Sequence, residues 1–342
     1  MLGFVKTSFL KTICVVAVGA VTLSLTGGEA AAQTYKLRFG PIAGPPPIFA
    51  AVVGYVAHQQ GFFKKHGVDV ELKSPESGTA AARALVSGDI DVAMAPSALT
   101  INQISNADAD VVAIWGMPHT SHVLATTDHK AGCADTKGQP VGIDVIGGAR
   151  ANSLRLILAS CKLKIEDVQQ IALPSTATMQ AMIADRLKFG VLHFDEIPVI
   201  AQQGKPVKII ARLVDITPNS HFLSLTVRKG ELAKNREAYV RFLAAIIDAA
   251  RFIRDPKNAD RVAEIAKITT RTTDQAKGAL EFLNPLGYWP ADDDGLDEKK
   301  LNAVIQTMVK VGNIRPGKTP VSYERLVDRS VWKDAVKLAD KK

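Results

Sequence analysis

The alternation of short apolar strands with helical segments constrains the fold of this chain more than any other feature of its sequence. The alternation starts at Tyr35 and begins again after Ser121. Alternating strands and helices favour parallel sheets with helices on both faces, because a helix is the usual connection between parallel strands. Two separate runs predict two lobes, which suits 342 residues better than one core does. The sequence therefore predicts an α/β fold with two doubly wound lobes.

Apolar periodicity, together with proline, glycine and N-cap residues, locates the individual elements. The predicted strands are 35–40, 68–72, 90–94, 111–115, 122–126, 141–143, 171–173, 189–192, 208–213 and 222–228. The predicted helices before Gly230 are 48–60, 80–86 with Thr79 as N-cap, one that starts at Pro96-Ser97, 149–159, 178–187 and 197–203. Beyond Gly230 the pattern is only helical, over 231–254, 259–268, 273–283, 298–311 and 323–339. We expect this helical tail to pack on the first lobe.

The first 32 residues have the organisation of a secretory signal peptide. Two lysines precede an apolar run over 13–25, and small residues end the segment at Ala32. The run is shorter than the roughly 20 apolar residues that a membrane-spanning helix needs, which favours cleavage over a membrane anchor. Cys14 lies too early to be a lipid-attachment cysteine. We therefore expect a free periplasmic protein, cleaved near Ala32, that begins near Gln33.

The charge of the chain says little about its partner. The formal net charge is +8, and loss of residues 1–32 removes two lysines and one glutamate and lowers it to +7. The basic residues are scattered through helices, and export disfavours nucleic acid as a partner. A basic exported protein could instead favour anionic solutes or an anionic membrane surface. We expect a monomer that binds a small molecule.

Motifs of the common enzyme classes are missing from the sequence. There is no Gly-x-Ser-x-Gly elbow, no P-loop and no Gly-x-Gly-x-x-Gly after the first strand. His119 and His122 are three residues apart, but no carboxylate or cysteine adjoins them, and a metal site needs three or four ligands. The acidic run Asp292-Asp293-Asp294 is interpreted as a solvated loop before a helix. The sequence predicts a binding protein rather than an enzyme, with no cofactor and no bound metal.

Four strand-to-helix turns carry residue types suited to binding a solute. In parallel sheets ligands bind at the carboxyl ends of strands, where free N–H groups and helix dipoles favour anionic or carbonyl oxygens. Ordinary helix capping explains any single turn, so the hypothesis depends on their number and register. We expect the helix start at Gly148 to contact ligand oxygens and Phe194 to line the cleft, the alternative for Phe194 being core packing. The candidate ligand-binding residues are Gly44, Ile48, Phe49, Ser77, Gly78, Pro96, Ser97, Met117, Gly147, Gly148, Asn152, Phe194 and Asp195.

Cys133 and Cys161 are the two cysteines that remain after processing, and export places them in an oxidising compartment. Cys133 precedes the strand 141–143, and Cys161 ends the helix that follows this strand. Because such a helix runs back antiparallel to its strand, both cysteines come to one edge of the second lobe. The sequence favours a disulfide between them, the alternative being two small buried residues.

The sequence resembles the periplasmic solute-binding proteins of ABC importers in the nitrate/sulfonate/taurine class, a family that also includes binding proteins for the thiamine pyrimidine precursor. The segments that carry the resemblance are 60–68, Ser77-Gly78, 88–93, 137–142, Gly147-Gly148, and 182–186 followed by Phe194-Asp195. Two positions depart from the family, which often has tryptophan in place of Phe194 and proline in place of Glu196. The triple proline at 45–47 is a further departure.

The resemblance implies a type II periplasmic-binding fold, with 33–119 and 221–342 in lobe one and 120–220 in lobe two. The chain would cross between lobes near 118–121 and 218–220, and closure about these crossings would trap a solute for recognition by the importer permease. It also implies a small anionic or heteroaromatic solute, held by N–H groups and hydroxyls at Ser77, Gly78, Ser97 and Gly148. Two alternatives stay open. One is a single-turnover thiamine-pyrimidine synthase on the same fold, which needs an iron-binding cysteine/histidine set, and the other is a ligand-sensing partner of a periplasmic receptor.

Overall fold

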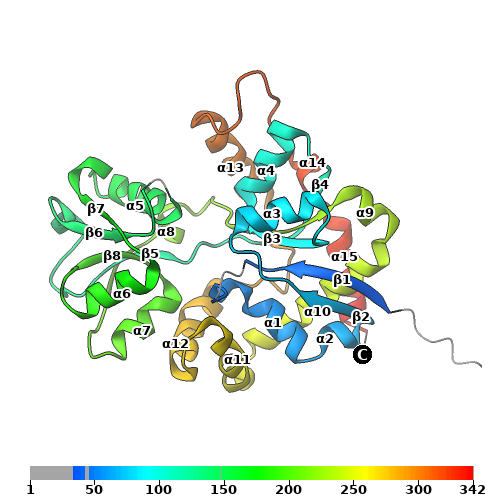
Figure 1. Ribbon diagram of the computed structural model, residues 1–342, viewed down its shortest axis with the longest axis horizontal. Coiled ribbons are helices and arrows are strands. Elements are labelled where there is room, and N and C mark those ends of the chain that lie inside the picture. The colour runs from blue at the N-terminus through cyan, green and yellow to red at the C-terminus, as the bar shows by residue number, and fades with distance from the viewer. Residues whose placement is uncertain (1–33, 43–45, 147, 342) are drawn as a thin grey trace, which may run out of the picture. The chain divides into compact units, whose positions relative to one another are not determined.

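The structure is a computed structural model that describes residues 34–42, 46–146 and 148–341 (Figure 1). The predicted signal peptide, Gly44 and Gly147 lie outside the described residues. No helix among the residues that the structure describes is both long and apolar enough to span a bilayer.

Two five-stranded sheets organise the described chain, and each has its own helices. The first sheet has the order β2-β1-β3-β10-β4 and consists of β1 (Tyr35–Gly40), β2 (Val68–Leu72), β3 (Val92–Pro96), β4 (Val111–Met117) and β10 (Leu223–Arg228). The second has the order β7-β6-β8-β5-β9 and consists of β5 (His122–Thr126), β6 (Pro140–Ile143), β7 (Gln169–Ala172), β8 (Phe189–His193) and β9 (Lys208–Arg212). Figure 1 shows the two sheets in separate α/β lobes, which agrees with the predicted fold class.

The alternation of strands and helices favours parallel pairing, and each sheet also contains one strand that runs antiparallel to its neighbours. β10 runs antiparallel to β3 and β4, and β5 runs antiparallel to β8 and β9. Both strands begin where the chain has just crossed from the other sheet. Leu223 therefore pairs with Met117 at the end of β4, and His122 pairs with His193 at the end of β8. A strand that enters a sheet at the edge where its neighbours end must run in the opposite direction to them.

Helices follow the strands in each lobe much as expected. The first lobe contains the short 3-10 helix η1 (Phe49–Ala51), α1 (Val52–Gln59), α2 (Phe62–Lys65), α3 (Gly78–Ser87) and α4 (Ser97–Ala107). The second contains α5 (Ala149–Ser160), α6 (Ser175–Ile183), the 3-10 turn η4 (Phe194–Glu196), α7 (Ile197–Ala201) and α8 (Leu213–Ile216). The N-cap of α3 is Ser77 and not Thr79, because the Ser77 Oγ accepts a hydrogen bond from the Ala80 N–H at 3.1 Å.

The helical tail consists of α9 (Lys229–Lys234), α10 (Arg236–Arg254), α11 (Ala259–Ala266), α12 (Thr273–Leu283), α13 (Glu298–Lys310), α14 (Tyr323–Leu326) and α15 (Arg329–Ala339). Two predicted helices are divided. The first breaks at Asn235, and the second breaks at Val327, which takes extended backbone and bridges to Ala113 on β4. Val327 thereby covers part of an edge strand, and the Asp328 carboxylate caps the next helix by accepting from the Ser330 N–H at 3.0 Å.

The tail packs on both lobes, which differs from the expectation of the first lobe alone. α10 contacts α1, α2 and α15, whereas α12 contacts α7 and η4 of the second lobe (Figure 1). The contact between α12 and η4 includes a stacked pair of aromatic rings, Phe282 and Phe194, with centroids 5.5 Å apart. The sequence pattern shows only that α12 is amphipathic, and it does not identify which lobe covers its apolar face.

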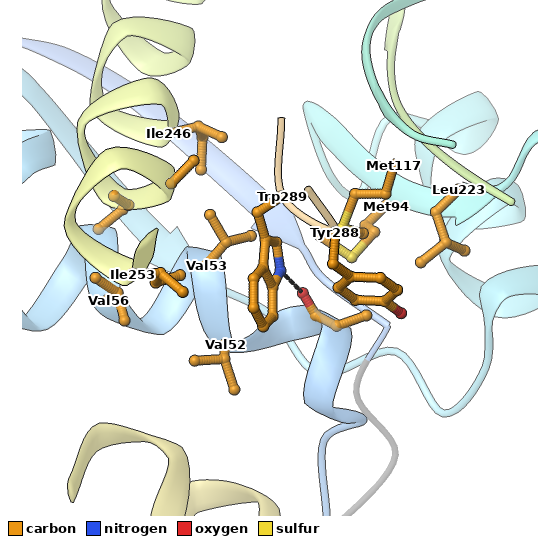
Figure 2. Close-up of a cluster of buried hydrophobic side chains, with 14 of the residues drawn as sticks. Val52, Val53, Val56, Met94, Met117, Leu223, Ile246, Ile253, Tyr288 and Trp289 are labelled. Carbon is orange, nitrogen blue, oxygen red and sulfur yellow. Dashed lines mark hydrogen bonds between the residues drawn. The ribbon is translucent and has the colours of Figure 1, made fainter. Parts of the chain in front are cut away.

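A buried aromatic pair fixes the start of α1. Figure 2 shows Trp289 among α1 and α10 side chains, including Val53 and Ile246, and Tyr288 beside Met94 and Met117. The Trp289 Nε1–H donates to the Ala50 carbonyl oxygen at 3.1 Å. This bond holds η1, which carries part of the functional site described below.

Cys133 and Cys161 are joined by a disulfide, with Cα atoms 6.2 Å apart. Cys161 ends α5, and Cys133 stands just before a 3-10 turn over Ala134–Thr136. The bridge therefore ties the start of the β6–α5 unit to the end of its helix, as the argument from the antiparallel return of the helix predicts.

We expect the Cys133→Ser/Cys161→Ser double variant to lose about 3 kcal/mol of unfolding free energy. The bridge closes a segment with a sequence separation of 28 residues, and the chain-entropy model gives about 3 kcal/mol for loops of this order. Urea unfolding of the oxidised protein and of the variant measures the difference. Solute affinity is expected to stay unchanged, and equal unfolding midpoints for the two proteins would show that the bridge contributes nothing.

Candidate functional site

A cavity of about 250 Å³ is bounded by both lobes and by both chain crossings. The first lobe and the tail contribute Pro46, Pro47, Ile48, Phe49, Ala50, Thr269, Thr270, Arg271, Leu283 and Tyr288. The second lobe contributes Arg150, Thr176, Met179, His193, Asp195 and Glu196, and the crossings contribute Ser121 and Phe222. Organic ligands bind in pockets of this kind, which are mostly apolar and carry a few convergent polar groups.

A second, more open hollow of about 610 Å³ is lined by Pro118, His119 and the segment 293–302 with Arg329. Apart from the two residues of the first crossing, its walls come from the tail alone. A relative movement of the lobes cannot enclose a solute between walls that belong to one lobe. We therefore place the candidate site in the smaller cavity.

Three parallel strand ends build the second-lobe wall of the cavity. β6 leads into α5, which carries Arg150, and β7 leads into α6, which carries Met179. β8 ends at His193, and η4 follows with Asp195 and Glu196. One Glu196 carboxylate oxygen accepts from the His193 backbone N–H at 2.9 Å, which closes the η4 turn. The turn thus directs two adjacent carboxylates toward the same cavity.

Two buried ion pairs dominate the electrostatics of the cavity. Arg150 donates to Glu196 at 2.8 Å and to the Val191 carbonyl at 2.8 Å, and the Arg150 and Glu196 side chains are 5% and 3% exposed. Arg271, in the loop before α12, donates to the Asp195 carboxylate at 2.7 Å and to the Asp195 carbonyl at 3.2 Å. Burial raises the pKa of Asp195, and the Arg271 guanidinium opposes this shift. The Arg271–Asp195 pair also joins the tail to the second lobe.

Neutral hydrogen-bonding groups form the part of the cavity next to the first crossing. The Ser121 hydroxyl is 2.6 Å from His193 Nδ1, and Tyr288 lines the same cavity. Burial lowers the pKa of His193 well below its usual value, and burial raises the pKa of Tyr288. The His193 ring lies 4.3 Å, between centroids, from the ring of His122, which is also held neutral by burial and whose Nδ1 is 2.8 Å from Ser153 Oγ. At neutral pH these groups offer hydrogen bonds without charge.

A third histidine is buried at the second crossing. His221 Nε2 donates to the Gly295 carbonyl at 2.8 Å, so its Nδ1 accepts from the Ser97 hydroxyl at 2.7 Å. Ser97 Oγ is also 2.6 Å from Ser224 Oγ. The ring is neutral in this arrangement, and burial lowers the pKa of His221 to about 4.

The stability of the protein is expected to fall as the pH decreases from about 6.5 to about 4, with His221 contributing on the order of 3 kcal/mol. The unfolded chain takes up the His221 proton near pH 6.5, whereas the folded chain resists protonation until about pH 4. The loss of stability caused by His221 is therefore absent above pH 7 and largest below pH 4. His221→Gln keeps a donor for the Gly295 carbonyl and removes the titration. Urea unfolding of both proteins from pH 7.5 to 4 should show the wild type losing on the order of 3 kcal/mol more stability than His221→Gln, and parallel curves would contradict the assignment.

Comparison with known proteins identifies the family of this chain. The model of the family described as NMT1/THI5 like matches residues 50–259. The chain belongs to the NMT1/THI5-like family. A Brucella abortus relative, named as a candidate binding protein, is 26% identical over 310 residues, which are 89% of this chain and 95% of the relative.

Several solved structures share the fold of this NMT1/THI5-like protein. The periplasmic nitrate-binding protein NrtA from Synechocystis PCC 6803 superposes with a TM-score of 0.68 and 14% identity, covering 91% of this chain and 90% of its own. The SsuA protein from Methylobacillus flagellatus is described as the periplasmic sulfonate-binding protein of a candidate sulfonate ABC transporter. It superposes with a TM-score of 0.66 and 14% identity, covering 90% of this chain and 96% of its own. The desulfurization enzyme DSZB superposes with a TM-score of 0.64 and 12% identity, covering 89% of this chain and 99% of its own. The fold therefore occurs in binding proteins and in an enzyme.

In this NMT1/THI5-like chain, three of the predicted site residues line the cavity, namely Ile48, Phe49 and Asp195. The turns after β2 and β3 come together in the first lobe, because a Cβ added to Gly78 would lie 2.5 Å from Pro96 Cδ. Ser77 caps α3 in this group. Ser97 and Met117 are buried in the first lobe, at 1% exposure each. For these residues contact with a solute stays a prediction.

The remaining predicted residues lie in the second lobe. Gly148 begins α5, and a Cβ there would lie 2.5 Å from Val145 Cγ1 and 2.8 Å from Asp144 Oδ1. Its substitution would therefore disturb its own turn before it reached a solute. Asn152 lies on the exposed side of α5. Phe194 is 1% exposed and stacks on Phe282.

The sequence reasoning missed most of the polar residues of the cavity. The sequence contains indications for two of these residues. Arg150 follows the Gly-Gly turn, and Glu196 lies three residues after His193, at the position of a capping carboxylate. It contains no such indication for Arg271 and Tyr288, because they lie in the helical tail and reach the cavity only through tertiary packing.

Proposed function

We propose that this protein is the solute-binding component of an ABC import system, capturing a small molecule between its lobes and delivering it to a permease. The observation that carries the proposal is that the walls of one cavity come from both lobes and both crossings. A rotation of one lobe about the crossings would open or close this cavity. Membership of the NMT1/THI5-like family and the fold shared with periplasmic binding proteins support the proposal.

The proposal includes the organisation of the mature protein. Residues 1–32 would be removed near Ala32, and the mature chain would act in the periplasm as a monomer. Lobe one would comprise 33–119 and 221–342, and lobe two 120–220. The strand contents of the two sheets are consistent with this division, since β5 to β9 all belong to the second sheet.

Solute capture would depend on shape and on a few polar contacts. Apolar side chains on opposite walls, such as Ile48 and Met179, would enclose the body of the solute. His193 and Ser121 would bond its polar edge. A solute that contacts both walls favours the closed form by its differential affinity for that form, which the permease could then recognise.

The alternative of a pyrimidine synthase requires a set of cysteine and histidine ligands for iron. Cys133 and Cys161 are bonded to each other and do not line the cavity. Across 34–42, 46–146 and 148–341, no group of three or more His, Cys, Asp or Glu side chains is placed to hold a metal ion. These observations favour a binding protein over that enzyme.

A thermal-shift screen of the chain 33–342 tests the proposal. The panel contains nitrate, sulfonates, carboxylates and pyrimidines, and a solute at 100 times its Kd should add about 2.7 kcal/mol of stability. Met179→Glu places a charge in the apolar wall and should abolish the shift, whereas Val309→Glu, at an exposed site on α13, should not. Chemical conversion of a bound compound, or equal shifts for wild type and Met179→Glu, would contradict the proposal.

A further inference from the structure

We infer that the solute is an uncharged organic molecule with an apolar body and a hydrogen-bonding edge, and that the cavity discriminates against inorganic and organic anions. The inference rests on the proposed function and specifies the class of solute. It is carried by three features of the protein, namely the pairing of the cations in the cavity, the occupation of one amide at each of three helix starts and the neutrality of the remaining polar groups of the cavity.

Both arginines that line the cavity are already paired with carboxylates of the chain. Arg150 is bound to Glu196 at 2.8 Å, and Arg271 is bound to Asp195 at 2.7 Å. All four side chains are at most 13% exposed. The formal charges cancel within the cavity wall, so an incoming anion meets no net positive charge to offset the cost of its own desolvation.

At the starts of α5, α3 and α4, one amide each is also occupied by an oxygen of the chain. At the start of α5 the Arg150 N–H donates to the Asp144 carboxylate at 3.4 Å, which places a negative charge where an anion would sit. At α3 the Ala80 N–H donates to Ser77 Oγ, and at α4 the Ser97 N–H donates to the Phe222 carbonyl at 3.0 Å. A helix terminus binds an anion through free N–H groups, and these amides are engaged by oxygens of the chain itself.

The groups that remain for a solute are neutral or apolar. His193 and Ser121 are hydrogen-bonded to each other on the side of the first crossing, and Tyr288 lines the same cavity. Phe222 and Met179 present apolar surface to the same space of about 250 Å³. A neutral donor or acceptor on the solute can replace its hydrogen bonds to water with hydrogen bonds to these groups at little cost in free energy. A buried anion loses far more hydration free energy than such neutral hydrogen bonds supply.

Charge-matched probe pairs test the inference by calorimetry on the chain 33–342 at pH 7.5. The pairs are benzamide and benzoate, nicotinamide and nicotinate, and benzenesulfonamide and benzenesulfonate, with sodium nitrate added. The uncharged member of each pair is expected to bind at least tenfold more tightly than its anion. The solute released by heat from protein purified out of its own periplasm, identified by mass spectrometry, is expected to be uncharged at pH 7.5.

Asp195→Asn provides the complementary measurement. It removes one carboxylate and leaves Arg271 without its charge partner, so the affinity for benzoate and benzenesulfonate should rise at least tenfold. Asp340→Asn is the matched control, because Asp340 pairs with Arg251 at 2.8 Å on the surface and away from the cavity, and its affinities should equal those of the wild type.

The outcomes separate this inference from the proposed function. Tighter binding of an anion than of its uncharged partner by the wild type, or release of an anionic solute from it, overturns the inference and leaves the proposed function intact. A folded Asp195→Asn variant with unchanged anion affinity also overturns it. Absence of binding by every probe, together with no released solute, counts against the proposed function and removes the inference with it.

Discussion

The substitution Phe194→Ala is expected to lower the free energy of unfolding by about 3–5 kcal/mol, the usual cost of truncating a buried aromatic side chain. The Phe194 ring is 1% exposed and stacks on Phe282 with an interplanar angle of 12°. The Arg212 guanidinium lies 5.9 Å from its centroid. The truncation would therefore leave a void between η4 and α12, where the tail meets the second lobe.

Urea unfolding and solute titration of the same preparations separate packing from solute contact. Phe222→Ala is the matched control, because Phe222 lines the cavity and is only partly buried. We expect Phe194→Ala to affect stability more than affinity and Phe222→Ala to affect affinity more than stability. The reverse pattern would restore the sequence-based expectation that Phe194 lines the cleft.

The substitution Glu196→Gln should destabilise the protein by about 3–5 kcal/mol, because it removes the carboxylate that pairs with the buried Arg150 guanidinium. The Arg150 side chain is 5% exposed, so water cannot replace the lost carboxylate. Glutamine keeps one oxygen, which can accept from the His193 N–H, but its amide NH2 then faces Arg150 in place of the oxygen that accepts from Arg150 in the wild type.

A surface pair provides the comparison for Glu196. Arg212 and Asp215 form an ion pair at 2.8 Å, but their side chains are 40% and 60% exposed. Asp215→Asn should cost no more than about 1 kcal/mol. Equal losses of unfolding free energy for Glu196→Gln and Asp215→Asn, measured by urea unfolding at pH 7.5, would show that the charge of Glu196 does not stabilise the buried Arg150. The double variant Arg150→Met/Glu196→Leu should recover most of the stability, since it leaves no unpaired charge.

The sequence predicted most of the fold because strand and helix periodicities are local. The strand 122–126 and the helix 273–283 have the predicted bounds, and the division into two sheets follows the two runs of alternation. The antiparallel directions of β5 and β10 were not predicted, because the direction of a strand depends on where the chain enters a sheet. The crossings set that entry point, and the pattern of apolar residues in the sequence does not indicate it.

The site was harder to predict than the fold. Ile48 and Asp195 were predicted because strand-to-helix turns face ligands in α/β proteins, and both line the candidate cavity. The charge balance of the cavity could not be derived, because Arg271 is 76 residues away from its partner Asp195 along the chain. Composition gives a basic protein, with a net charge of +8, whereas the cavity itself is electrically balanced.

The central position of β10 has a consequence for the order of folding. β10 is the last strand of the chain, yet it lies between β3 and β4 in the first sheet. While the chain emerges from a ribosome or a translocation pore, β3 and β4 have no hydrogen-bonding neighbour between them until residue 228 has appeared, 111 residues after β4 ends at Met117. The second sheet is contiguous in sequence from β5 to β9 and can form during that interval. The second lobe can therefore assemble before the first lobe. The sheet of the first lobe keeps unpaired strand edges at β3 and β4 until β10 has been synthesised.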